Sequence, residues 1–134
     1  MEESDHPSVT QILQLLEDDE NIYIVMELLT GGNLQEVFNE ADCYLSEASV
    51  MHVIKQLMAA LAYLHGTKNI VHRDIKPANL LVEIHRKEIE KIDIKLTDFG
   101  FATFKENSTV MSQKVGTLYY MAPELVAQRN ASEE

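Results

Sequence analysis

One stretch decides the fold of this chain, the ten residues His72-Arg73-Asp74-Ile75-Lys76-Pro77-Ala78-Asn79-Leu80-Leu81. Two further motifs follow it, Thr97-Asp98-Phe99-Gly100 and Gly116-Thr117-Leu118-Tyr119-Tyr120-Met121-Ala122-Pro123-Glu124. The first motif places a carboxylate, an amine and an amide oxygen on one short loop, and the second adds another carboxylate. Chemistry at a phosphate group needs such side chains, because a proton must move, negative charge must be compensated and a metal ion needs oxygen ligands. Each motif alone is weak evidence, but the three in this order predict a single site.

Together the three motifs resemble the catalytic half of a protein kinase. The resemblance implies an α+β, bilobal protein-kinase-like fold, of which this chain is a part. Residues 1–29 are expected to form the end of the small lobe and the hinge, and residues 30–134 the first part of the mainly helical large lobe, through the activation segment. The implied reaction transfers the γ-phosphate of ATP, with Mg²⁺ as a second cofactor, to a Ser or Thr hydroxyl of a protein. The alternative is a non-catalytic binding module, meaning a truncated or pseudokinase-like chain.

The resemblance gives catalytic roles to polar side chains of all three motifs. Asp74 is expected to accept or orient the proton of the substrate hydroxyl, and Lys76 to contact the γ-phosphate. Asn79 and Asp98 are expected to be the ligands of Mg²⁺, and Thr117 is expected to bridge the carboxylate and the lysine. An aspartate before Phe-Gly is by itself more often a turn residue, but its position downstream of the first motif favours the metal role. The lysine two residues after Asp74 is typical of serine/threonine kinases. The sequence is also similar to the calcium/calmodulin-dependent and autophagy-type groups of kinases, but no motif in it separates these two groups.

The nucleotide is expected to lie against the segment that crosses between the lobes. By resemblance, Met26 is the gatekeeper, the carbonyl of Glu27 and the backbone of Leu29 face the adenine edge, and Leu81 lies beneath the ring. Asn33, just after the hinge, is also counted among the cofactor-binding positions. An ordinary buried strand would give the same apolar pattern, so the side chains here do not by themselves separate the two interpretations.

Other motif residues are expected to be structural or to set specificity. By resemblance, His72 packs in the core against Phe99 and a small-lobe residue, Ile12, and is not a catalytic base. Phe101, a large apolar residue after the glycine of the second motif, implies a preference for serine over threonine.

Arg73 implies an activation segment that a phosphate group can order. The usual acceptor position holds Gln113, whereas Ser108, Thr109 and Ser112 lie nearby, so the site of such regulation stays open.

Periodicity predicts the larger elements. Two strands are expected at 9–16 and 22–29, joined by an acidic turn, and two more at 80–82 and 92–96, joined by a charged insert on the surface. Apolar residues at three- and four-residue steps predict a long helix over 46–65. For this helix Ser46 is the expected N-cap, Leu45 and Val50 the hydrophobic staple, and Gly66 the C-terminal stop.

Composition narrows the class of protein. The chain has 134 residues, 46% of them hydrophobic, which is enough for the core of one small domain. Its net charge of -11 argues against a general nucleic-acid surface, and no apolar run is long enough for a membrane span. A cytoplasmic location is expected, with the nucleus as an alternative. Cys43 is the single cysteine, so an internal disulfide is excluded and an ordinary thiol is expected. Substrate, pathway and oligomeric state are not encoded in these patterns.

The resemblance also implies parts that this sequence lacks. A kinase needs a glycine-rich loop over the phosphates, a strand lysine and a glutamate that pairs with it. None of these is found here, and Gly31-Gly32 has no third glycine at the required spacing. We therefore expect the chain to begin partway through the small lobe and to end before the arginine that usually pairs with Glu124. The segment alone is expected to be inactive.

Overall fold

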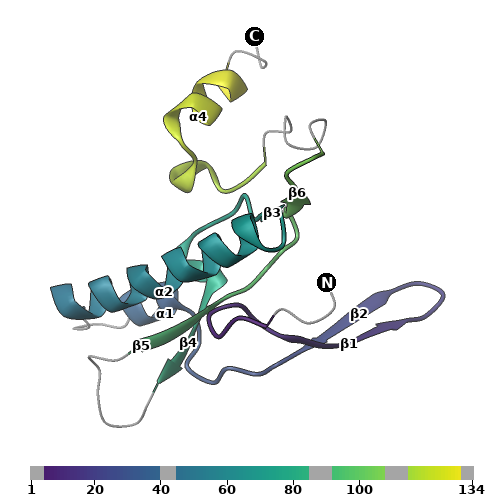
Figure 1. The fold of residues 1–134 in the computed structure, drawn as a ribbon, viewed down its shortest axis with the longest axis horizontal. Helices are drawn as coiled ribbons and strands as arrows, with labels where there is room; N and C mark the ends of the chain where they lie inside the picture. Colours follow the sequence, from purple (N-terminus) through teal and green to yellow (C-terminus); the bar gives the residue numbers. More distant parts are fainter. Residues whose placement is uncertain (1–4, 40–44, 85–91, 108–114, 131–134) are drawn as a thin grey trace.

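The computed structural model describes residues 5–39, 45–84, 92–107 and 115–130. Its elements form three small antiparallel sheets, β1–β2, β3–β6 and β4–β5, together with one long helix, α2. In Figure 1, α2 runs across the centre above the β4–β5 hairpin, the β1–β2 ribbon projects away to the right, and α4 lies at the top. Among the described helices, none is both long and apolar enough to cross a bilayer.

The first hairpin forms as the sequence predicts, but its strands are shorter. β1 spans Ile12–Glu17 and pairs with β2, Ile22–Met26. The carboxylate of Asp18 holds the turn, because its Oδ1 accepts the backbone N–H groups of Glu20 at 2.9 Å and Asn21 at 2.8 Å. Most side chains of the ribbon are exposed on both faces, although nearly all are apolar.

The expected start of the first strand, at residue 9, was wrong. Val9 is fully buried and forms a parallel bridge with Leu96 in β5, so it belongs to the packing of the other sheet. The N–H of Thr10 donates to the Leu96 carbonyl at 3.0 Å, and the N–H of Leu96 donates to the Ser8 carbonyl at 2.9 Å. The second strand also ends early, at Met26, because the chain there leaves the ribbon.

Helix α2 spans Glu47–Gly66, close to its predicted bounds. Ser46 is the N-cap as expected, and its hydroxyl accepts the N–H of Ser49 at 3.1 Å. Gly66 does not stop the helix, since it is the last helical residue and Thr67 is the C-cap. The left-handed residue that turns the chain away is Asn69, with φ of 55°.

The core lies between α2 and the hairpin of β4, Leu80–Ile84, and β5, Ile92–Leu96. The helix contributes Val53, Ala60 and Leu64, and every second residue of β5 points into the same core. Gln56 locks the helix to β5, because its side-chain amide donates to the Ile92 carbonyl at 2.9 Å and accepts the Ile94 N–H at 3.0 Å. The two predicted strands are thus confirmed, and β4 extends into the expected insert, whose residues 85–91 lie outside the described residues.

Several short elements have no counterpart among the predicted ones, because few residues give no readable period. They are α1 (Leu34–Asn39), β3 (Ile70–Val71), the 3₁₀ turn Pro77–Asn79, β6 (Thr103–Phe104), the 3₁₀ turn Leu118–Tyr120 and α4 (Pro123–Asn130). α1 does carry a sequence signal. Asn33 and Glu36 form a capping box, in which Asn33 Oδ1 accepts the Glu36 N–H at 3.0 Å and Glu36 Oε2 accepts the Asn33 N–H at 2.9 Å.

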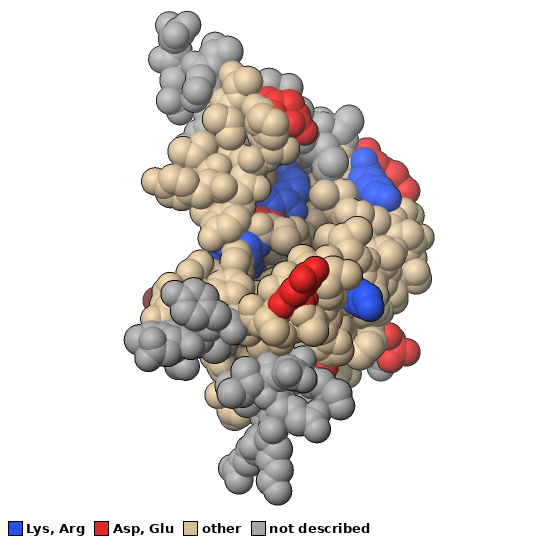
Figure 2. All heavy atoms as spheres, turned by 90° about the vertical axis from the view of Figure 1, so that its left-hand side faces the viewer, with Lys and Arg blue, Asp and Glu red and all other residues tan. Residues whose placement is uncertain are grey.

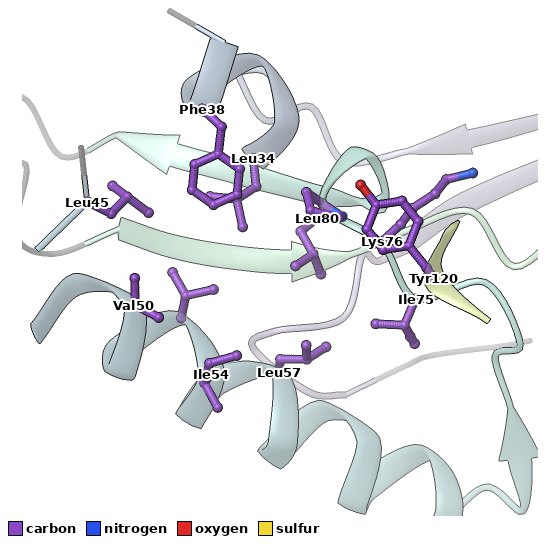
Figure 3. A pocket seen from close by; sticks show the side chains of 12 residues that line it. Leu34, Phe38, Leu45, Val50, Ile54, Leu57, Ile75, Lys76, Leu80 and Tyr120 are labelled. Atoms are coloured by element: carbon purple, nitrogen blue, oxygen red, sulfur yellow. The ribbon is translucent and has the colours of Figure 1, made fainter. Parts of the chain in front are cut away.

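An apolar cavity of about 270 Å³ opens between α1, α2 and the loop that precedes β4 (Figure 3). Leu45 and Val50, the expected staple, both line it. Val50 and Ile54 remain 42% and 45% exposed, so this stretch of the helix stripe is uncovered. The full lining is Leu34, Phe38, Leu45, Val50, Val53, Ile54, Leu57, Ile75, Lys76, Pro77, Leu80 and Tyr120.

Candidate active site

The loop between β3 and β4 is built around a buried histidine. The ring of His72 is 1% exposed, accepts the Asp74 N–H at Nδ1 (3.3 Å) and donates from Nε2 to the Thr97 carbonyl (2.9 Å). Burial lowers the pKa of His72, which keeps the ring neutral. A neutral ring has one donor nitrogen and one acceptor nitrogen, as these two hydrogen bonds require. Its centroid lies 4.9 Å from that of Phe99, which confirms the expected packing. Ile12 and Phe99 line one common cavity.

Asp74 is the centre of the site. It is 3% exposed, and its Oδ1 accepts both the N–H (2.9 Å) and the hydroxyl (2.7 Å) of Thr117. Its Oδ2 accepts Lys76 Nζ at 2.8 Å and Asn79 Nδ2 at 3.1 Å. Lys76 Nζ also donates to Thr117 Oγ1 at 2.9 Å. The structure therefore brings together all four side chains that the sequence predicts to be catalytic, and it makes the expected Thr117 bridge.

The surroundings keep Asp74 ionised. Burial alone would raise the pKa of this carboxyl, but the hydrogen bonds from Lys76 and Thr117 and the charge of the lysine outweigh it, so the pKa is lowered. The carboxylate is therefore ionised at neutral pH, which is the form that can accept a hydrogen bond from a hydroxyl group and orient it.

The orientation of Asn79 fits a role as a metal ligand. Its Nδ2 donates to the Asp74 carbonyl at 2.9 Å and to Asp74 Oδ2. Because both partners are acceptors, the amide nitrogen must face Asp74 and the amide oxygen must face away from it. That oxygen and a carboxylate are the hard ligands that Mg²⁺ takes in protein sites.

Asp98 lies two residues after the end of β5, and its backbone is in the left-handed region with φ of 60°. Its carboxylate is exposed, and Oδ1 accepts the Gly100 N–H at 3.3 Å. The strained backbone turns the chain immediately after the strand, where sparsely populated conformations are often functional. Among the described residues, no trio of His, Cys, Asp and Glu gathers at metal-binding distance. Mg²⁺ commonly takes only one or two ligands from the protein and the rest from phosphate and water, so a site of this kind does not require such a trio.

The third motif reaches the first through a close backbone approach. Gly116 has φ of 121°, and a Cβ placed there would lie 2.7 Å from the carbonyl oxygen of Arg73. Only glycine can bring Thr117 this near to Asp74. On the other side of the loop, Arg73 Nε donates to the Phe101 carbonyl at 2.6 Å, which ties the first motif to the second. The sequence resemblance did not single out these two contacts.

The expected nucleotide-binding residues fall at three places. Met26 lines a cavity of about 290 Å³ together with Asp98, and its Sδ lies 4.0 Å from the hydroxyl of Thr97. Leu81 forms an antiparallel bridge with Asn33. Glu27 and Leu29 lie on the crossing segment, where Leu29 lines a separate cavity.

Asn33 has an evident structural role, since its side chain caps α1. Its part in cofactor binding stays a prediction. Residues 108–114, among which the site of phosphorylation was left open, and Cys43 lie outside the described residues.

Comparison with known proteins assigns the family. All of residues 1–134 match the family described as "Protein kinase domain". The chain is 39% identical over 121 residues to myosin light chain kinase A of Dictyostelium discoideum, which covers 90% of the chain and 39% of that protein. It is 38% identical over 126 residues to calcium-dependent protein kinase 5 of Plasmodium berghei (strain Anka), covering 94% of the chain and 22% of that protein.

A solved structure agrees with this likeness. A chain from the crystal structure of the yeast RNA Pol II CTD kinase CTDK-1 complex superposes with a TM-score of 0.73 at 32% identity, covering 90% of this chain and 38% of that one. This chain therefore belongs to the protein kinase family, and its fold is part of the bilobal kinase fold. Both of these relatives in sequence are named as kinases, and the chain spans 22% to 39% of their length.

Proposed function

We propose that this chain is the central part of a serine/threonine protein kinase that uses Mg²⁺ and ATP. The observation that carries the proposal is the closed network of Asp74, Lys76, Asn79 and Thr117. A buried carboxylate, a lysine and an outward-facing amide oxygen on one loop suit phosphoryl transfer to a hydroxyl, because this reaction depends on positioning and charge compensation. Protein kinases in general use ATP and Mg²⁺ and act on proteins.

The network defines what each side chain would do. Mg-ATP supplies the transferable phosphoryl group and the positive charge that compensates it. Asp74 orients the substrate hydroxyl and receives its proton, and Lys76 places its cation beside both the carboxylate and the transferred phosphoryl group. Asn79 and Asp98 present oxygen atoms to the metal ion.

The four donors around Asp74 match the roughly four lone-pair positions of a carboxylate. A substrate hydroxyl must therefore displace one of them. The Asn79 Nδ2 contact to Oδ2 is the longest, at 3.1 Å, and this group also donates to the Asp74 carbonyl at 2.9 Å. We infer that this contact yields to the substrate.

A non-catalytic binding module is the alternative. It has no physical need for a buried, ionised aspartate with four donors, since such a group is costly to bury and useful chiefly in proton transfer. The same reasoning favours an enzyme that is intact in the longer protein.

The charge and the cysteine content of the sequence indicate the partner and the cellular location of the enzyme. The net charge of -11 favours a protein substrate rather than a nucleic acid as the partner, and on the face shown in Figure 2 basic and acidic side chains are interspersed. We infer a cytoplasmic, or alternatively nuclear, location because the sequence has a single cysteine and therefore no internal disulfide.

The test is a phosphotransfer assay on the complete natural protein that contains residues 1–134. With Mg-ATP and a mixed peptide library, phosphate should appear on serine or threonine, and Asp74→Asn should abolish the transfer while the protein still folds. If the intact protein binds nucleotide but transfers no phosphate under any activating condition, the binding-module alternative is correct.

A further inference from the structure

The segment that crosses from β2 to α1 is held at two ends and open between them. At its far end the N–H of Gly31 donates to the Val82 carbonyl at 3.1 Å, and the N–H of Val82 donates to the Gly32 carbonyl at 2.9 Å. Within the described part of the chain, no hydrogen bond engages the backbone of residues 28–30, and Leu28 is 86% exposed. These backbone groups are therefore available to a ligand.

The near end is held by a carboxylate. Both Glu27 oxygens accept Lys95 Nζ at 2.8 Å, and Glu27 Oε1 also accepts the N–H of Gln11 at 2.7 Å. The N–H of Glu27 in turn donates to the Gln11 carbonyl at 3.1 Å. One carboxylate thus joins Gln11, the residue just before β1, to the start of the crossing segment and to β5.

This contact is stronger than an ordinary surface ion pair. The side chains of Lys95 and Glu27 are only 22% and 25% exposed, and the carboxylate has a further donor in the backbone. Burial would raise the pKa of Glu27, but the Lys95 and Gln11 hydrogen bonds outweigh it and the pKa is lowered. The charged form is therefore the one that this environment stabilises.

Both anchors belong to the same hairpin. Val82 is on β4 and Lys95 is on β5, in adjacent pairs of one ladder (Leu81↔Lys95 and Val82↔Ile94). The chain continues from the end of β5 through Thr97 to Asp98. The hairpin therefore fixes the distance between the open backbone of residues 28–30 and the carboxylate that is expected to bind metal.

We propose that Lys95 is a positioning residue for the nucleotide. By clamping Glu27 to β5 it holds the backbone of residues 27–29, which is expected to face the adenine, at a fixed distance from Asp98. This inference rests on the proposed kinase function, and it assigns the role to a residue that touches no reacting atom. Without the clamp the crossing segment moves relative to Asp98, so a nucleotide must order it on binding. Nucleotide affinity should fall, whereas the Asp74 network, which shares no contact with Lys95, should keep its turnover.

The first test measures binding without turnover. In the complete protein, Lys95→Met should weaken both adenosine and the non-hydrolysable Mg-AMP-PNP by about five- to tenfold, since a charge-assisted contact that orders the base site is lost. Asp98→Asn should weaken only Mg-AMP-PNP, because adenosine carries no phosphate. Lys55→Met, which removes an exposed lysine on α2, is the matched control and should change neither affinity.

A second pair of variants distinguishes the loss of this ion pair from misfolding of the protein. Glu27→Gln keeps an acceptor for the Gln11 N–H and should reproduce the loss from the other side of the pair. The exchange Glu27→Lys with Lys95→Glu should restore part of the affinity, because the ion pair forms again although lysine offers no acceptor to the Gln11 N–H, and a merely destabilised hinge would show no recovery. In phosphotransfer assays Lys95→Met should raise the KM for ATP by the same factor and leave kcat unchanged.

The outcomes separate this inference from the proposed function. Unchanged adenosine affinity in folded Lys95→Met or Glu27→Gln, or a fall in kcat with KM constant, would overturn the role of Lys95 while leaving the kinase assignment intact. If the protein binds adenosine in a Lys95-dependent manner but never transfers phosphate, the positioning role of Lys95 is supported and the proposed kinase activity is refuted.

Discussion

Removing the hydroxyl of Thr117 should impair catalysis while leaving the fold intact. Valine has nearly the same shape as threonine, so Thr117→Val deletes the 2.7 Å bond to Asp74 Oδ1 and the 2.9 Å bond from Lys76 Nζ without opening a cavity. The backbone N–H of residue 117 still donates to Oδ1, at 2.9 Å, so the carboxylate stays partly held. These bonds act on kcat by positioning the Asp74 carboxylate and the Lys76 ammonium for the reaction, and displacement of such groups lowers kcat by about 10- to 100-fold.

The pH profile gives a second readout of the same change. The Thr117 bonds help to hold the pKa of Asp74 below its usual value of 3.8, in spite of the opposing effect of burial. Deleting the hydroxyl therefore raises this pKa. Because Asp74 acts as a base, activity is lost as the pH falls through its pKa, so the acid limb of kcat/KM should move to higher pH in the variant. The stability that the ionised Asp74 contributes is present above the unfolded pKa and is lost as pH falls through the lower, folded pKa.

The assay is steady-state phosphotransfer by the complete protein at saturating Mg-ATP, with thermal unfolding measured in parallel. Thr117→Ser is the matched control, because it keeps the hydroxyl, and it should retain kcat within about threefold. A folded Thr117→Val protein with kcat within about twofold of the wild type would show that the hydroxyl only stabilises the loop, and the reasoning would fail.

Three further predictions concern the metal ligand, specificity and the isolated segment. Asp74→Asn and Asp98→Asn should each lower turnover by about two orders of magnitude or more. Only Asp98→Asn should weaken the binding of Mg-ATP in a titration, since only this change removes a metal ligand. Equal and unaltered affinities of the two variants would contradict the assignment of Asp98 to the metal. Phe101→Val should shift the preference of the complete kinase from serine toward threonine, and a wild-type preference for threonine on a peptide array would end this inference. Residues 1–134 expressed alone should transfer no measurable phosphate and should aggregate, because the β1–β2 ribbon has unpaired edges and an apolar cavity is open beside α2. Size exclusion and an assay beside Asp74→Asn test the last point, which a soluble monomer with Asp74-dependent transfer would refute.

Much of the fold was readable from the sequence because its main elements have local causes. The apolar stripe and the Ser46 cap define α2, an acidic turn joins β1 to β2, and alternation defines β5. The central residues of the site were also readable. Asp74 and Asn79 lie within six residues of each other, so one short loop must bring them together.

The tertiary structure decided what lies between motifs that are distant in sequence. Thr117 reaches Asp74 across 43 residues, because Gly116 allows two backbones to approach closely. Lys95 reaches Glu27 across 68 residues. Val9 reads as the start of a strand in the first hairpin, yet it packs on β5, since burial beside Leu96 outweighs its local preference for the ribbon. Local patterns set which segments become helix or strand, whereas the register and packing of those segments set which side chains meet.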